Sequence, residues 1–321
     1  MLRYIIRRVA MLFVTLFIVF MMLFITARFA QLERQELESF TDVLWLDKLR
    51  IAFQDFVPYL KNVVTSWDWG VDRGNNPVWP ELMKRADLTL RLNALAFFFY
   101  FGFGIVFGTL SALFRGNIFD RVIHTAFLVA SSIPPYIMIM VLIMVLGYYI
   151  PLFPRQEPYA SHGLWLNLKG LVIPVLAVSI YPMVQITRLV RGEMLEAFYS
   201  DYLALLKTKG LNKRQIIFRH LLKDSVVPIL PQIVPIMLYV LGSSFIVEVV
   251  YNINGVTDWL FRSMFRPASF GVYYVSITLP PMVLIGTFFT ALILIIGLFI
   301  DIVYGLLDPR VTMGAKKNGF N

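Results

Sequence analysis

Apolar runs long enough to cross a membrane limit the fold of this chain more than any other feature. A transmembrane helix needs roughly 20 apolar residues to cross about 30 Å of hydrocarbon. In lipid, a helix can satisfy all its backbone hydrogen bonds within one segment. Suitable runs occupy residues 9–29, 92–114, 122–149, 171–190, 229–250 and 277–304. We therefore predict an all-α membrane protein with six transmembrane helices.

Composition also favours lipid over water as the main surroundings of the chain. Charged residues make up 15% of the sequence and hydrophobic residues 58%, whereas an average soluble domain has about 25% charged residues. The net charge of +9 could indicate nucleic-acid binding, but basic residues beside apolar spans are explained more simply as orientation signals. The absence of cysteine excludes disulfides and thiolate metal sites. We expect membrane lipid, and no nucleic acid, among the partners.

The distribution of Lys and Arg predicts that both termini are cytoplasmic, because short cytoplasmic loops carry an excess of these residues. The cytoplasmic side would carry Arg3, Arg7, Arg8, Arg115, Arg121, the basic residues of 201–231, Arg310, Lys316 and Lys317, and the short outer loops only Arg155, Lys169, Arg262 and Arg266. The basic start resembles that of a signal peptide, but the apolar run is too long and no small-x-small cleavage site follows Ala27. We expect an uncleaved first helix.

Residues 31–87 form the largest predicted extracytoplasmic segment. Apolar residues recur in it at helical spacing, at Leu44, Leu46, Leu49, Phe53, Phe56 and Leu60. The stretch "SWDWGVDRGNNPVWPELMKR" follows and is rich in turn residues and tryptophan. One interpretation is an interfacial helix and an aromatic belt on the membrane; the other is a docking surface for a partner.

Prolines recur within the spans and indicate a packed, kinked bundle around a path rather than simple anchors. They are Pro134, Pro135, Pro174, Pro182, Pro228, Pro231, Pro235, Pro280 and Pro281. Gly102, Gly104 and Gly108 allow close helix approach. Small polar residues within the spans suit a path that tolerates many cargo side chains. The candidate path residues are Ser131, Ser132, Ser243, Ser244 and Glu248.

Residues that could support other chemistries are sparse. Glu248 and Asp301 lie near span ends rather than at the midplane, which disfavours a proton-coupled secondary carrier. His124, His162 and His220 fall at different sides or depths and cannot form one metal site. No G-x-x-x-x-G-K-[ST] loop is present to bind ATP. We therefore expect a non-catalytic chain without a metal or cofactor of its own.

The stretch "DYLALLKTKGLNKRQIIFRHLLKDSVVPILP", residues 201–231, is charged yet patterned like a helical hairpin. A short amphipathic helix is predicted from Met194 to Lys209. Gly210 can adopt a positive φ where that helix ends. Asn212 and Gln215 have the spacing of a capping box, which begins a second helix that continues to Pro228. The sequence thus predicts a rigid cytoplasmic helix–turn–helix rather than an ordinary charged loop.

This stretch resembles the cytoplasmic loop of ABC-importer permeases, most closely the B-type permease of the dipeptide/oligopeptide/nickel branch. "MLRYIIRRV", "SSIPPY", "VEVVYNINGV" and "DIVYGLLDPRV" agree with that family in the same order, so the resemblance covers nearly the full length. The matching hairpin residues are Asp201, Tyr202, Lys209, Gly210, Leu211, His220, Asp224 and Pro228. The chain departs from the family at Leu206 and Thr208, where small alanines are usual, and at Thr257, where a further glycine is usual.

The resemblance implies a type I ABC-importer permease fold in which the hairpin is the helix that couples to an ATPase subunit. The residues implied in this coupling are Asp201, Tyr202, Lys209, Gly210, Leu211 and His220. Implied partners are a second homologous permease, two cytoplasmic ATPases that bind ATP and Mg, and an extracytoplasmic peptide-binding protein. Movement of the ATPases would switch the spans between inward-open and outward-open states.

We therefore expect a subunit of an ATP-driven importer of oligopeptides or dipeptides in the bacterial cytoplasmic membrane. A nickel or metal-chelate importer of the same family, and a secondary carrier, are the alternatives. The expected organisation is a cytoplasmic start and first transmembrane helix (1–30), an extracytoplasmic segment (31–87), a permease core with five transmembrane helices (88–310) containing the coupling hairpin (193–228), and a cytoplasmic tail (311–321).

Overall fold

The computed structural model of the chain describes residues 2–39, 44–156, 163–267 and 273–307. The predicted tail, residues 311–321, lies outside this part. The chain divides by packing into two units, residues 1–89 with 254–298 and residues 90–253 with 299–321. The first unit therefore combines the predicted first span and segment 31–87 with most of the last span.

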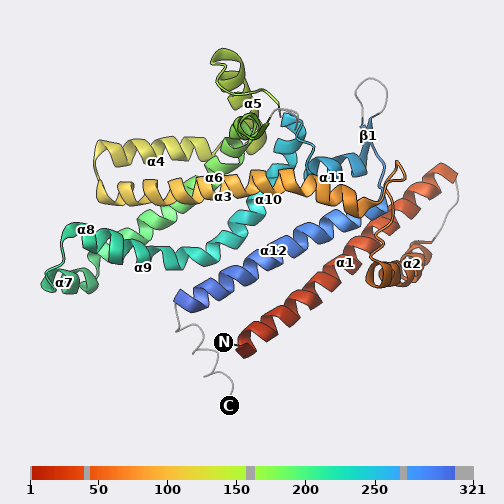
Figure 1. Ribbon diagram of the computed structural model, residues 1–321, viewed down its shortest axis with the longest axis horizontal. Coiled ribbons are helices and arrows are strands. Elements are labelled where there is room, and N and C mark those ends of the chain that lie inside the picture. The colour runs from red at the N-terminus through yellow and green to blue at the C-terminus, as the bar shows by residue number, and fades with distance from the viewer. Residues whose placement is uncertain (1, 40–43, 157–162, 268–272, 308–321) are drawn as a thin grey trace. The chain divides into compact units, whose positions relative to one another are not determined.

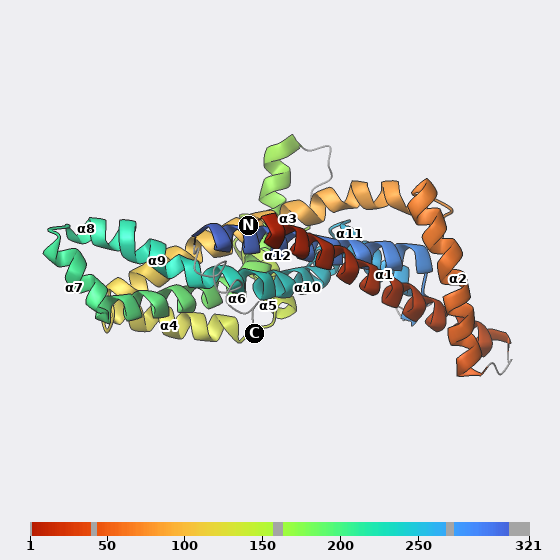
Figure 2. The same ribbon diagram turned by 90° about the horizontal axis from the view of Figure 1, so that it is seen from below.

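The first unit consists mainly of helices (Figure 1). Aromatic and aliphatic side chains form its core. Its elements are α1 (Leu2–Ser39), α2 (Trp45–Ser66), the start of α3 (Val78–Leu113), α11 (Val256–Met264), the antiparallel strands β1 (Phe265–Pro267) and β2 (Tyr273–Val275), and most of α12 (Leu279–Leu307). Helices α1 and α12 lie side by side in both views (Figures 1 and 2).

Helix α2 confirms the helix predicted in segment 31–87 but buries a different set of residues. Phe56 is 5% exposed and packs on Phe20 and Phe24 of α1, with ring centroids 5.6 and 5.5 Å away. Leu44, just before α2, and Leu46 are 72% and 60% exposed. The helix therefore uses only part of its apolar surface in this unit. Contact of the remainder with the membrane stays a prediction.

The tryptophan-rich stretch folds differently from the prediction in two respects. It forms turns only as far as Pro77, because α3 begins at Val78 and takes up the remainder. Trp69 is 7% exposed and lies in the core of the unit, with Trp67 and Trp79 against it. An aromatic belt that includes Trp69 is therefore wrong, because its ring is used for packing within the protein.

The second unit contains the hairpin and the bundle that leads to it (Figures 1 and 2). Its further elements are α4 (Ile118–Ser131), α5 (Pro135–Leu142), the π-helix η1 (Ile143–Tyr149), α6 (Gly163–Tyr199), α7 (Asp201–Thr208), α8 (Lys213–Gln215), the π-helix η3 (Ile216–Leu221), α9 (Leu222–Val226), the 3₁₀-helix η4 (Val227–Gln232) and α10 (Ile233–Tyr251).

The predicted third span, 122–149, is not one straight helix. The chain bends by 106° between α4 and the segment Pro135–Tyr149, which comprises α5 and η1. Pro134 and Pro135 lack backbone N–H groups and cannot continue the hydrogen-bond ladder of α4. At the end of α4 the hydroxyls of Ser131 and Ser132 donate to the Leu128 carbonyl, at 3.0 and 2.9 Å.

The lengths of the other helices agree with the predicted spans. In the described residues, five helices are long and apolar enough to cross a membrane, and the bent pair brings the number to six if it is one span. The protein is thus an all-α membrane protein.

Helices α3 and α6 pack closely against each other within the second unit. A Cβ atom added to Gly104 would lie 2.7 Å from Ile186 Cβ, and one added to Gly108 only 2.6 Å from Val190 Cβ. The Thr187 hydroxyl donates to the Gly104 carbonyl at 3.3 Å across the same contact. The predicted role of these glycines is confirmed. That of Gly102 is wrong, since nothing lies within 4 Å of a Cβ added there.

Candidate functional site

The hairpin of residues 201–228 has the turn that its sequence predicts. Gly210 has a φ of +73°, a conformation that residues with a Cβ rarely adopt. The Gln215 N–H donates to Asn212 Oδ1 at 2.9 Å, and the Asn212 N–H donates to Gln215 Oε1 at 3.1 Å. The predicted capping box is therefore confirmed. The predicted helix from 194 to 209 is interrupted, because α6 ends at Tyr199 and Ser200 adopts an extended backbone before α7 begins.

The two arms of the hairpin share a small hydrophobic core. Leu206 of α7 is 2% exposed and packs with the buried Ile216 and Leu221 of η3. Partly buried neighbours complete this core, namely Ala197, Phe198, Leu203 and Leu211. Leu206, where the family usually has a small residue, thus fills the centre of the hairpin. A hairpin with its own core can move as one body.

Two predicted coupling residues meet across the hairpin. The Tyr202 hydroxyl and His220 Nδ1 lie 3.3 Å apart and are hydrogen-bonded. Burial raises the pKa of Tyr202, and the neighbouring Asp224 carboxylate raises it further. Asp224 is therefore part of this polar contact between the arms.

The remaining coupling residues lie on or near the hairpin surface. Asp201 and Lys209 are exposed, and Leu211 packs against the hairpin core. Sequence reasoning missed Leu205 and Phe218, which are 51% and 57% exposed although apolar. Aromatic side chains such as Phe218 are enriched at surfaces that contact another protein.

Asp120 and Arg191 connect the α3–α4 turn to α6, nine residues before Ser200, and were not singled out from the sequence. Asp120 is 5% exposed. Arg191 Nε and Nη2 donate to Asp120 Oδ1 and Oδ2 at 3.1 and 3.0 Å. The same carboxylate accepts from the Ser111 hydroxyl and, at 3.1 Å, from the Gly116 N–H. Displacement of α6 at Arg191 would therefore displace the α3–α4 turn.

The proposed path residues lie in different surroundings. Ser131 is partly exposed and Ser132 is exposed at the end of α4. Ser243 is 8% exposed and Ser244 is fully buried in α10, where its hydroxyl contacts Asn93 Oδ1 at 2.9 Å. Glu248 is also fully buried. Ser244 and Glu248 therefore pack between helices here, and the path role of all these residues stays a prediction.

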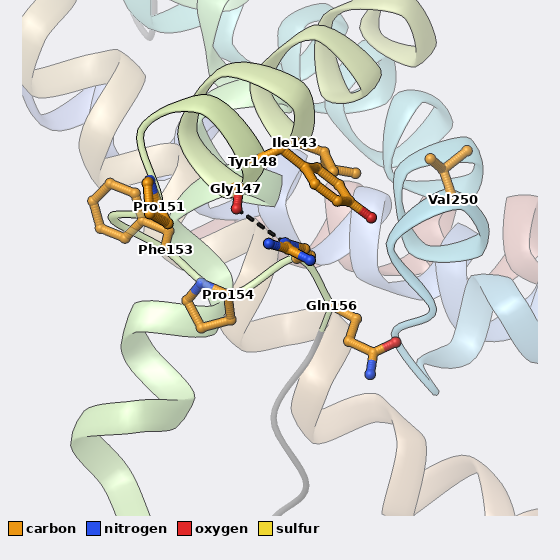
Figure 3. Close-up of a pocket in the computed structure, with 9 residues that line it drawn as sticks. Ile143, Gly147, Tyr148, Pro151, Phe153, Pro154, Gln156 and Val250 are labelled. Carbon is orange, nitrogen blue, oxygen red and sulfur yellow. Dashed lines mark hydrogen bonds between the residues drawn. The ribbon is translucent and has the colours of Figure 1, made fainter.

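A pocket of about 690 Å³ lies between η1 and the end of α10 (Figure 3). Its lining residues are Ile143, Gly147, Tyr148, Pro151, Phe153, Pro154, Arg155, Gln156 and Val250. Arg155 Nε donates to the Gly147 carbonyl at 3.0 Å, and its guanidinium lies 3.8 Å from the Tyr148 ring centroid. The Tyr251 hydroxyl donates to the Pro154 carbonyl and holds this loop on α10.

In the described residues, no group of three or more His, Cys, Asp or Glu side chains could hold a metal ion. His162, one of the histidines considered from the sequence, lies outside those residues.

Comparison with known proteins agrees with the sequence resemblance. Residues 104–313 match the family described as "Binding-protein-dependent transport system inner membrane component". The dipeptide transport system permease protein DppB of Lactococcus lactis is 25% identical over 328 residues, which cover 98% of this chain and 100% of the relative. DppB of Bacillus subtilis is 28% identical and covers 83% of this chain and 81% of its own length. DppB of Escherichia coli is 26% identical, over 84% of this chain and 83% of the relative.

Proposed function

The chain belongs to the family of inner membrane components of binding-protein-dependent transport systems, and on that premise we propose that it is a permease subunit of an ATP-driven importer of dipeptides or oligopeptides. Similarity to several dipeptide permeases along most of the chain supports the cargo class. The subunit would supply half of the translocation path, and specificity would reside mainly in an extracytoplasmic binding protein.

The observation that carries this proposal is the hairpin with its own core at the end of α6. ATP hydrolysis in partner subunits must be converted into movement of the spans, and only a stiff connection can transmit such movement. Leu206, Ile216 and Leu221 make the hairpin stiff, and exposed Leu205 and Phe218 give it a surface for an ATPase. In this proposal two ATPases bind ATP and Mg, and this chain has no catalytic role.

The route of movement continues from the hairpin into the bundle. Helix α6 is joined to the α3–α4 turn by Asp120 and Arg191, and its contact with α3 is too close for side chains at Gly104 and Gly108. These contacts would make α3, α4 and α6 respond together when the hairpin is displaced. The proposal places the hairpin and both termini in the cytoplasm of a bacterium, with the subunit in the cytoplasmic membrane beside a second, homologous permease.

The test is transport by the complete complex in vesicles. The chain is co-purified with its partner permease and ATPases, and uptake of labelled peptides and of labelled nickel is measured with binding protein and ATP. We expect peptide uptake that requires ATP. Nickel uptake without peptide uptake would assign the chelate cargo instead. Peptide uptake that depends on a proton gradient and does not require ATP would identify a secondary carrier.

A further inference from the structure

Arg155 is held in one orientation at the wall of the pocket between η1 and α10. Its Nε donates to the Gly147 carbonyl, the bond drawn as a dashed line in Figure 3, and its guanidinium plane is covered by the Tyr148 ring. A guanidinium has donors on Nη1 and Nη2 as well. These two groups bond to no other residue in the part of the chain that the structure describes. The side chain is thus oriented through Nε, while Nη1 and Nη2, with two N–H groups each, have no hydrogen-bond partner among the described residues.

Gly147 leaves space for this arrangement. A Cβ atom added to Gly147 would lie 3.0 Å from Arg155 Cγ, closer than side chains normally approach. Gly147 therefore accepts a hydrogen bond from Nε through its carbonyl and, having no side chain, leaves space for the Arg155 side chain beside it. The loop is held from the other side by the bond between Tyr251 and Pro154.

The pocket chemistry matches a carboxylate with a neighbouring amide. Two guanidinium donors fit the two oxygens of a carboxylate. Gln156 supplies an amide that can accept as well as donate. A terminal peptide unit has a carboxylate to accept hydrogen bonds and an N–H to donate one, whereas a phosphodiester group has no such donor. Ile143, Phe153 and Val250 provide apolar wall for a side chain.

We propose that this pocket binds the C-terminal carboxylate of a peptide cargo at the outer end of the second unit, with Arg155 as the residue that recognises it. The assignment rests on the proposed function, which supplies the cargo class and places the pocket on the extracytoplasmic side. It adds that this subunit itself distinguishes peptides with a free C-terminus.

A direct test uses cross-linking, which does not require import. The photoreactive residue p-benzoylphenylalanine replaces Val250 in the assembled complex, and radiolabelled trialanine or its C-terminal amide is added before illumination. Cross-linking should favour the free acid, by about tenfold or more given the strength of charge-assisted hydrogen bonds. Arg155→Gln should abolish this preference. Arg155→Lys should keep only part of it, because lysine cannot make the paired contact.

Gly147→Ala is the second variant, because it keeps the charge and crowds the Arg155 side chain at Cγ. It should reduce cross-linking of the acid while leaving assembly with the ATPases intact. Equal cross-linking of acid and amide with Arg155 present would overturn the proposal. Cross-links to phospholipid in place of peptide would also overturn it and assign the arginine to a lipid phosphate.

The import assay separates failure of this proposal from failure of the proposed function. In vesicles that import trialanine, acid should be preferred to amide by the wild type and not by Arg155→Gln. Import of both forms at equal rates by the wild type would contradict the pocket assignment while keeping the importer. Acid-selective cross-linking without any ATP-dependent import would support the pocket and contradict the importer.

Discussion

Arg191 on α6 forms a two-point ion pair with Asp120, which lies 71 residues earlier in the chain and is almost completely buried. The carboxylate also accepts from the Ser111 hydroxyl and the Gly116 N–H, so the α3–α4 turn is organised around it. Fixed geometry of this kind suits transmission of movement, because neither helix can shift by a residue without breaking several bonds at once.

Breaking this pair should cost both stability and coupling. Asp120→Ala leaves Arg191, whose side chain is 30% exposed, without its partner, and it removes the acceptor of the Gly116 N–H. It should lower the free energy of unfolding by roughly 1–3 kcal/mol. Arg191→Lys keeps the charge but loses the two-point contact. We expect it to assemble while transport per ATP hydrolysed falls.

Thermal unfolding in detergent and the ratio of transport to ATP hydrolysis measure the two effects. The control is Arg121→Lys, because Arg121 is exposed on the same helix as Asp120. The paired exchange of Asp120→Arg with Arg191→Asp should recover part of the lost stability. A coupling ratio unchanged in Arg191→Lys would contradict the transmission role.

The turn of the hairpin should tolerate asparagine at position 210 but not valine. Gly210 is needed for its φ of +73° and not for space, since nothing lies within 4 Å of an added Cβ. Gly210→Val should introduce strain of roughly 1–3 kcal/mol, whereas asparagine adopts this conformation more readily.

Substrate-stimulated ATP hydrolysis should therefore fall in Gly210→Val and persist in Gly210→Asn, with membrane insertion equal in both. Full stimulated activity in the valine variant would remove the basis for assigning the hairpin to coupling. Equal loss in both variants would show that the glycine serves contact rather than conformation.

Adjacent leucines on α7 provide a matched pair for the hairpin core. Leu206 is 2% exposed and Leu205 is 51% exposed. Leu206→Ala should lower hairpin stability by roughly 2–5 kcal/mol, through lost packing and the cavity left behind. Leu205→Ala should leave stability unchanged.

Limited proteolysis of the hairpin measures this difference. If Leu205 contacts an ATPase, its alanine variant should lose affinity for the ATPase without faster cleavage. Equal cleavage of the two variants would contradict the hydrophobic core described for the hairpin.

The effect of an alanine substitution on α3 should depend on whether the glycine it replaces faces α6. A Cβ atom at Gly108 would lie 2.6 Å from Val190, whereas one at Gly102 has nothing within 4 Å. Gly108→Ala should therefore destabilise the bundle by roughly 1–3 kcal/mol through overpacking. Gly102→Ala should be neutral or slightly stabilising, because glycine is a poor helix former. Thermal unfolding of both variants tests this, and equal midpoints would argue against close packing at Gly108.

Features set by neighbouring residues could be predicted from the sequence, and features set by distant contacts could not. The capping box of Asn212 and Gln215 and the positive φ of Gly210 depend on a few consecutive residues. The apolar spans follow from the length of each run. The pairing of Asp120 with Arg191 depends on the packing of separate helices, and neither residue has a local signature.

Intermediate cases were predicted only in part. Pro134 and Pro135 indicate a kink, but the angle of 106° also depends on what α5 packs against. The spacing of α2 predicts a helix but not that Phe56 is buried while Leu46 is exposed. The orientation of Arg155 depends on the π-helical turn of η1, which brings the Gly147 carbonyl to its Nε.

The final prediction concerns the orientation of the chain in the membrane, which the basic residues around the spans indicate. The sequence has no cysteine, so a single introduced cysteine reports its own position without background. Lys213 begins α8 in the hairpin, and Asn75 lies in the exposed turn between α2 and α3. Lys213→Cys should react with a membrane-impermeant maleimide only after the cells are opened, and Asn75→Cys in intact cells. A permeant maleimide should label both and serves as the control for accessibility. The opposite pattern would place the hairpin outside the cell, where it could not meet a cytoplasmic ATPase.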